Sequence, residues 1–236
     1  MDLQSKIAAA AALLERIQYE YSPATLASSL GAEDMVLTDL IARYAPGIGI
    51  FSLDTGRLNP ETYELLAKIQ GSYGDKVRIE VYYPQAQAIQ QYVNAHGINA
   101  FYDSVELRKQ CCGIRKVEPL GRALQGLSAW MTGLRREQSV TRTSLSAVES
   151  DAAHGGIAKI NPLAAWTVDD LWAYTREHRV PYNRLYDQGY TSIGCQPCTR
   201  AIEAGEDGRA GRWWWELPEH KECGLHVAMK SWSPAI

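Results

Sequence analysis

Five cysteines divide into two kinds by their spacing. Four form two close pairs, Cys111-Cys112 and Cys195-x-x-Cys198, and the fifth, Cys223, stands alone near the C-terminal end. Paired thiolates are common ligands of metal ions and iron–sulfur clusters. A single thiol among charged residues and next to a glycine is typical of a nucleophile. The spacing therefore predicts two separate tasks for sulfur in this chain.

The adjacent pair bears on which metal site the four cysteines fit. Neighbouring side chains point to opposite faces of a strand and diverge by about 100° on a helix, so two adjacent thiolates fit a single tetrahedral zinc poorly. They fit two different irons of a larger cubane. We therefore expect a [4Fe–4S] cluster whose ligands are Cys111, Cys112, Cys195 and Cys198. A Cys-x-x-Cys motif alone is also typical of a redox-active pair or a zinc half-site, and adjacent cysteines are often plain core residues.

Cys223 lies in the charged run Lys221-Glu222-Cys223-Gly224-Leu225-His226. A nearby lysine or histidine lowers the pKa of a thiol, and a glycine lets the backbone approach a ligand closely. His226 is a candidate for contact with the same ligand. The simpler interpretation is an unreactive surface thiol, and the run by itself does not decide between the two.

Two predicted turns carry groups that bind nucleotides. Ser28-Ser29-Leu30-Gly31 joins a strand to a helix, so its hydroxyls and free N–H groups form a candidate anion site. Asp54-Thr55-Gly56 ends the next strand and can accept hydrogen bonds from ribose hydroxyls. An ordinary capped turn is the simpler interpretation of each, and the first lacks the Gly-Lys-Ser/Thr of a Walker loop.

Basic residues supply the positive charge that an anionic ligand needs. Five are candidate ligands of phosphate or sulfate: Lys116, Arg135, Arg136, Arg209 and Arg212. Arginine binds such anions through two parallel hydrogen bonds. Three consecutive tryptophans, 213–215, follow the last arginine and cannot all face one core, which favours a dry, cationic pocket wall. A solvated surface position is the simpler interpretation of the lysine.

The elements that must position these residues alternate between two periodicities. Strands are expected at 24–30, 48–53, 77–83, 129–133 and 157–160, and helices at 1–20, 33–44, 59–69, 86–95 and 168–178. This order predicts an α/β fold with a parallel sheet covered by helices on both faces, which binds ligands at the carboxyl ends of its strands. Thr167 and Asp170 are expected to cap the last of these helices.

Composition restricts the class of protein. The 236 residues are 46% hydrophobic and 22% charged, and the formal charge of -3 predicts no basic surface for nucleic acid. No apolar run approaches the ~20 residues of a membrane-spanning helix, and the N-terminal segment lacks the pattern of a secretory signal. We expect a cytoplasmic protein without membrane contact, in which grouped cysteines bind metal rather than form disulfides.

Together these residues resemble the assimilatory adenylyl-sulfate reductases, within the phosphoadenylyl-sulfate reductase family. The resemblance covers about residues 22–226. Its most specific segments are 109–112, 194–200, 211–216 and 221–226, with weaker ones at 28–34 and 53–57. It implies an adenine-nucleotide alpha-hydrolase-like fold of the ATP pyrophosphatase type. Residues 1–200 would form the reductase domain with the cluster site, and residues 201–236 a flexible tail that carries the catalytic cysteine.

The resemblance also implies the activity, which is thioredoxin-dependent reduction of adenylyl sulfate to sulfite and AMP. The Cys223 thiolate would attack sulfur and release AMP, and reduced thioredoxin would free sulfite from the resulting S-sulfonate. The nucleotide would be held by Ser28, Ser29, Gly31, Asp54, Thr55 and Gly56. The anionic groups would be held by Lys116, Arg135, Arg136, Arg209, Arg212 and His226. The cluster would order the site without passing electrons.

Other functions stay open at this point. Family members that use 3′-phosphoadenylyl sulfate typically lack the four paired cysteines, so their presence favours adenylyl sulfate, but a reductase of the other nucleotide or of both is the first alternative. A tRNA-thiolating ATP pyrophosphatase is more distant, because the Ser-Gly-Gly-x-Asp-Ser form of its loop is missing. A zinc-stabilised binding module is a third alternative. Assembly into a homo-oligomer is compatible with the sequence.

Overall fold

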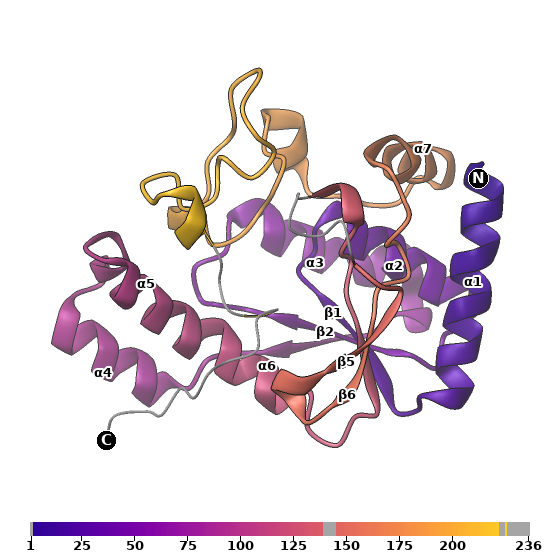
Figure 1. The fold of residues 1–236 in the computed structure, drawn as a ribbon, viewed down its shortest axis with the longest axis horizontal. Helices are drawn as coiled ribbons and strands as arrows, with labels where there is room; N and C mark the ends of the chain where they lie inside the picture. Colours follow the sequence, from indigo (N-terminus) through magenta and orange to yellow (C-terminus); the bar gives the residue numbers. More distant parts are fainter. Residues whose placement is uncertain (1, 139–144, 222–224, 226–236) are drawn as a thin grey trace.

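The computed structural model describes residues 2–138, 145–221 and 225. Within them, six strands form one sheet in the order β3-β2-β1-β4-β6-β5 (Figure 1). The strands are β1 (Ala24–Ser28), β2 (Gly49–Leu53), β3 (Ile79–Tyr82), β4 (Ala129–Met131), β5 (Val148–Asp151) and β6 (Ile157–Ile160). The pairs among β1, β2, β3, β4 and β6 are parallel, and β5 runs antiparallel to β6 at one edge. The predicted parallel α/β sheet and its five predicted strands are confirmed.

Helices cover both faces of this sheet. They are α1 (Leu3–Glu20), α2 (Ala32–Tyr44), α3 (Pro60–Tyr73), α4 (Ala86–His96), α5 (Val105–Cys112), α6 (Glu118–Ala123) and α7 (Val168–His178). All five predicted helices are confirmed, and the predicted capping box of Thr167 and Asp170 is present at the start of α7. None of the helices in the described part of the chain has the length and apolar character needed to cross a bilayer.

Alternation along the strands divides the core into two layers. Leu26 of β1, Ile50 of β2 and Met131 of β4 face the larger apolar cluster, which includes residues of α1, α2, α3 and α7. Phe51 follows Ile50 on β2, and Trp130 precedes Met131 on β4. Both face the opposite layer, which includes residues of α6. Both faces of the central strands β1, β2 and β4 are therefore largely buried, as expected for parallel strands between helical layers.

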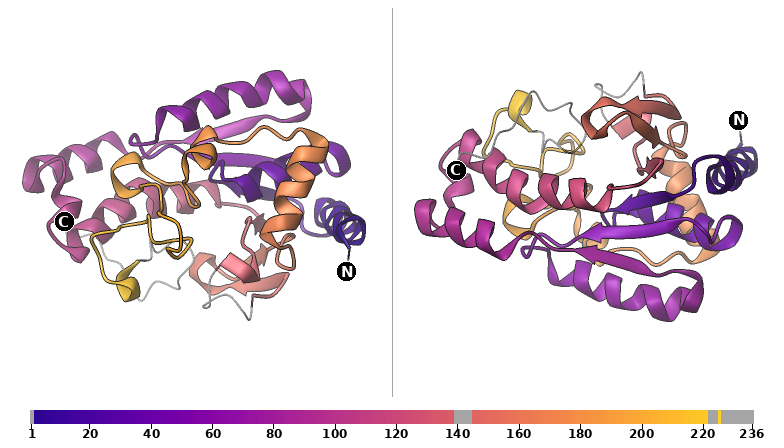
Figure 2. Two further views of the ribbon diagram at one scale, coloured as in Figure 1. Left: turned by 90° about the horizontal axis from the view of Figure 1, so that it is seen from above. Right: turned by 90° about the horizontal axis from the view of Figure 1, so that it is seen from below.

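Two further features lie next to the site. A π-helical turn, Gly113–Val117, joins α5 directly to α6, and such turns occur frequently at functional sites. After α7, residues 179–221 form a largely irregular segment with short 3₁₀ turns. Figure 2 shows this orange and yellow segment lying over the sheet when the molecule is seen from above. It forms a roof above the carboxyl ends of the central strands.

Candidate functional site

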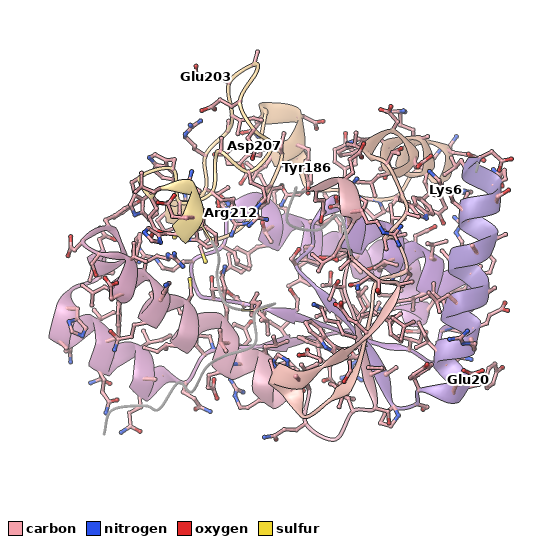
Figure 3. All side chains as sticks on the ribbon, viewed as in Figure 1. Lys6, Glu20, Tyr186, Glu203, Asp207 and Arg212 are labelled. Atoms are coloured by element: carbon pink, nitrogen blue, oxygen red, sulfur yellow. The ribbon has the colours of Figure 1, made fainter. Side chains whose placement is uncertain are left out.

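A cavity of about 530 Å³ lies at the carboxyl ends of β1, β2 and β4. Its floor comes from the residues at or after these strand ends, including Ser28, Ser29, Thr55 and Thr132. Its roof comes from 191–195 and 207–213 of the irregular segment. Figure 3 shows Asp207, Tyr186 and Arg212 together above the sheet, far from Lys6 and Glu20 on α1. This main cavity occupies the position at which parallel sheets bind their ligands.

The loop between β1 and α2 is held in shape by Asp34. The Oδ2 atom of Asp34 accepts hydrogen bonds from the Ser29 backbone N (2.7 Å) and from its Oγ (2.6 Å). The Ser28 hydroxyl accepts a further bond from the backbone N of Leu30, which has a positive φ of 60°. Gly31 is the N-cap residue of α2. The predicted Ser28–Gly31 turn therefore lines the main cavity in a fixed conformation at a helix N-terminus.

Asp34 is buried, and burial changes the pKa of its carboxyl. Burial raises the pKa of Asp34 from 3.8 to about 6, against the hydrogen bonds from Ser29, which lower it. Gly133 after β4 comes close to the same carboxyl. A β-carbon added at Gly133 would lie 2.4 Å from the Asp34 Oδ1 and 2.7 Å from the Glu33 Cβ. The carboxyl is thus enclosed by two loops that both line the main cavity.

We predict that Gly133→Ala destabilises the protein by about 1–3 kcal/mol, because the new methyl group overlaps the Asp34 carboxylate and the Glu33 β-carbon. Denaturant unfolding measures the change. Gly121→Ala on α6 is the matched control, since no atom lies within 4 Å of a β-carbon added there. The control should be neutral or slightly stabilising, as alanine favours a helix by up to ~1 kcal/mol over glycine. Equal effects of the two variants would contradict the close approach.

Replacing the buried carboxyl should change how stability depends on pH. A carboxyl whose pKa is raised by folding stabilises the protein fully below its unfolded pKa and loses this contribution as pH rises through its folded pKa. For Asp34 the window runs from 3.8 to about 6. The free energy of unfolding of wild type relative to Asp34→Asn should fall by up to about 3 kcal/mol across this window. A difference that does not vary with pH would contradict the assignment.

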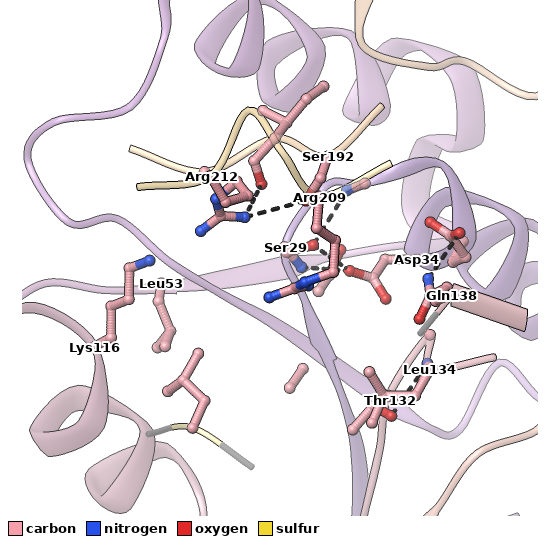
Figure 4. A pocket seen from close by; sticks show the side chains of 18 of the residues that line it. Ser29, Asp34, Leu53, Lys116, Thr132, Leu134, Gln138, Ser192, Arg209 and Arg212 are labelled. Atoms are coloured by element: carbon pink, nitrogen blue, oxygen red, sulfur yellow. Dashed lines mark hydrogen bonds between the residues drawn. The ribbon is translucent and has the colours of Figure 1, made fainter. Parts of the chain in front are cut away.

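Three cationic side chains project into the main cavity. Lys116 comes from the π-helical turn, and Arg209 and Arg212 come from the roof on the other side (Figure 4). Arg212 Nη1 donates to the Ser192 Oγ at 3.3 Å and to the Ile193 carbonyl at 3.2 Å. Its buried Nε has no hydrogen-bond partner among the described residues. The three side chains give the main cavity a positively charged end.

The two adjacent arginines after β4 have different surroundings. Arg135 lines the main cavity, but its Nε and Nη2 donate to the Glu33 Oε1 at 3.0 and 2.9 Å, and its Nη1 to Glu137 at 3.1 Å. Its charge is therefore largely balanced by carboxylates. Arg136 is exposed, donates to the Leu145 carbonyl at 2.9 Å and does not line the cavity. Anion binding by either remains a prediction.

The three residues of the turn after β2 also differ in their surroundings. The Asp54 Oδ1 accepts from the Gly56 backbone N (2.7 Å) and the Tyr63 hydroxyl (3.0 Å), so this carboxylate closes the turn. Gly56 has a φ of 68°, which favours glycine. Of the three predicted residues, Thr55 lines the main cavity, and its hydroxyl lies 3.2 Å from the Cys195 sulfur.

The four paired cysteines come together in one place. All four are buried thiols that form no disulfide, and they lie in one apolar cluster with Phe101 and Trp213. They line a second, small cavity, the cysteine cavity, with the cationic side chains of Arg57, Arg108, Arg115 and Lys116. Within the described ranges they are not arranged as a ligand set for one metal ion.

The surrounding charges shift the pKa values of the cysteines in different directions. Burial raises the pKa of Cys195, but Lys116, the Thr55 hydroxyl and Arg212 outweigh it, so this pKa is lowered overall. Burial and the neighbouring Cys195 thiolate raise the pKa of Cys198 to about 12. Four thiolates cannot be buried together without compensating charge.

The donor set fits a thiolate-bound cluster. Cysteines from two distant segments face one space, and cationic residues offset the negative charge that four thiolates bring. The indole Nε1 of Trp213, a residue of this cavity's wall, is buried without a hydrogen-bond partner among the described atoms. Sulfur is an acceptor for such a group, though a weak one.

The two cavities share a wall. Lys116, Cys195 and Trp213 line both of them. Cys223 and His226 lie outside the described residues, but Leu225, between them in sequence, lines the main cavity and packs near the apolar cluster of Phe51. The chain beside the predicted nucleophile thus reaches the cavity that contains the cations.

Comparisons with known proteins agree with this geometry. Residues 23–201 match the model of the phosphoadenosine phosphosulfate reductase domain. The chain belongs to this family. It is 58% identical over 224 residues to the adenosine 5′-phosphosulfate reductase of Allochromatium vinosum, covering 95% of this chain and 86% of the relative. It is 54% identical over 234 residues to the enzyme of that name from Burkholderia cepacia, covering 99% and 92%.

Solved structures extend the likeness to the fold. The phosphate complex of phosphoadenylyl-sulfate reductase from Candida auris is 28% identical, with a TM-score of 0.70, over 82% of this chain and 90% of that one. The FMN adenylyltransferase of Candida glabrata is 15% identical, with a TM-score of 0.57, over 86% and 68%, and shares the fold alone. The expected adenine-nucleotide alpha-hydrolase-like fold is confirmed, and this family member is an oxidoreductase that acts on sulfur groups.

Proposed function

We propose that this protein reduces adenylyl sulfate to sulfite and AMP in sulfate assimilation. One observation carries the proposal. The cavity at the strand ends contains Lys116, Arg209 and Arg212, and the same cavity is lined by Leu225, two residues beyond Cys223. A phosphosulfate requires such positive charge, and a thiol has to reach its sulfur. The names of the two bacterial relatives point to the same substrate.

The cysteine chemistry balances without another redox centre. The Cys223 thiolate attacks the sulfur of adenylyl sulfate, the S–O bond to phosphate breaks, and AMP leaves with the electron pair. A thiol of reduced thioredoxin then attacks the Cys223 sulfur and expels sulfite. The second thioredoxin thiol resolves the mixed disulfide, so thioredoxin is oxidised by two electrons and Cys223 is regenerated. The cations favour the first step by neutralising charge on the leaving phosphate.

The four paired cysteines are proposed to hold a [4Fe–4S] cluster. Cys111 and Cys112 would ligate it from the end of α5, and Cys195 and Cys198 from the roof. When bound, such a cluster supplies a fixed, anionic group that orders the surrounding cations. Arg115, whose Nη1 donates to the Thr55 carbonyl, links this cavity to the turn after β2.

A reductase of 3′-phosphoadenylyl sulfate is the second candidate, because the Candida auris neighbour carries that name. The two candidates differ in one phosphate on the ribose. Comparing kcat/KM for the two nucleotides decides between them, and we expect adenylyl sulfate to be preferred. A preference for the other nucleotide would replace the substrate while leaving the thiol chemistry intact.

A single turnover tests the proposed chemistry. The protein is mixed with sulfur-labelled adenylyl sulfate in the absence of thioredoxin. We expect label on Cys223 and release of AMP, because the first step needs no reductant. The Cys223→Ser variant should bind AMP with wild-type affinity and acquire no label. Wild-type protein that acquires no label at Cys223 would overturn the mechanism.

A further inference from the structure

Arg108 and Glu216 form a buried ion pair between distant parts of the chain. Arg108 Nε donates to the Glu216 Oε1 at 2.9 Å and Nη2 to Oε2 at 2.7 Å. The two side chains are 0% and 3% exposed. Taking two charges out of water costs several kcal/mol, so such a pair adds little net stability over apolar residues of similar size. Its presence has to be explained by what it holds in place.

One end of the pair belongs to the cysteine cavity. Arg108 lies on α5 one turn before Cys112, on the same side of the helix, and its side chain lines that cavity. Its guanidinium is also within hydrogen-bonding reach of the Cys112 sulfur. Arg108 is therefore fixed directly beside the proposed cluster ligands.

The other end belongs to the chain that leads to Cys223. The Arg108 guanidinium lies 4.8 Å from the Trp213 ring centroid and donates to the His220 carbonyl as well as to Glu216. One side chain thus contacts three points of a segment whose secondary structure is limited to short turns. This segment ends three residues before Cys223.

We propose that Arg108 and Glu216 are positioning residues that fix segment 213–220 against the cysteine cavity and so determine where the chain delivers Cys223 to the substrate. The inference rests on the proposed role of Cys223. Neither Arg108 nor Glu216 lines the main cavity, so they act without touching the nucleotide.

The geometry of the pair makes two conservative changes informative. Glu216→Gln keeps the shape but leaves the Arg108 charge buried without a carboxylate, which is strongly unfavourable. Arg108→Lys keeps the charge but loses the planar fork that contacts two oxygens and the ring. Glu64→Gln is the matched control, because Glu64 also pairs with an arginine distant in sequence, Arg184, but at the surface.

Limited trypsin digestion of the anaerobically purified protein measures whether segment 213–220 is held in place. Lys221 follows the anchored stretch, and its side chain donates to the Ala210 carbonyl at 3.4 Å. Cleavage after Lys221 should be at least ~10-fold faster in Glu216→Gln and Arg108→Lys than in wild type, because a local opening exposes the bond. Glu64→Gln should be cleaved at the wild-type rate.

Single-turnover transfer of label to Cys223 is the second readout. In both single variants the rate should fall at least ~10-fold while the Kd for AMP stays within about twofold, as expected of residues that act on positioning and not on binding. The double variant Arg108→Met, Glu216→Met should recover stability, since apolar residues can replace a buried pair, but should not recover the rate.

Wild-type cleavage and transfer rates in Glu216→Gln would overturn the proposal. So would wild-type transfer in the double variant, or failure of all three variants to fold, which would make the pair a purely structural one. If wild-type protein acquires no label at all, the proposed function fails. The digestion comparison then still decides whether the pair anchors the segment.

Discussion

The structure depends on one wall of positive charge that serves two sites. In the proposed function, Lys116 and the arginines near it offset four cluster-bound thiolates on one side and a phosphosulfate on the other. Burial and neighbouring thiolates favour the protonated form of a thiol, and they raise the pKa of Cys198 even with Lys116 nearby. Cys195 and Trp213 also line both cavities. In the proposed function the same side chains would therefore act on both anionic groups.

Local chain geometry makes this wall possible. The π-helical turn after Cys112 has a wider turn than an α-helix, and it carries Arg115 and Lys116 between the two cavities. Asp34 performs a comparable task at the other end of the main cavity, where it shapes the serine loop. Arg115 and Asp34 are both buried, and each holds a stretch of backbone through hydrogen bonds. Neither side chain can move toward a ligand without breaking these bonds.

The sequence predicted the parallel sheet and its covering helices because hydrophobic periodicity reports burial on each face of an element. It did not predict β5, whose Val-Glu-Ser-Asp run is a polar edge with a single apolar residue. The grouping of the four cysteines was correct, since their spacing alone marks them as a set. The partners of charged groups were not predictable. Arg135 pairs with Glu33, 102 residues away, and Arg108 and Glu216 meet only through the tertiary fold.

We propose that the four cysteines surround an iron–sulfur cluster beside the main cavity. The decisive experiment is an anaerobic visible spectrum of the purified protein, combined with iron, sulfide and zinc analysis. We expect a brown protein with the broad absorbance of thiolate-bound iron and an iron and sulfide content that fits one [4Fe–4S] cluster per chain. Cys112→Ser should lose most of that absorbance. A colourless protein with stoichiometric zinc would exclude the cluster.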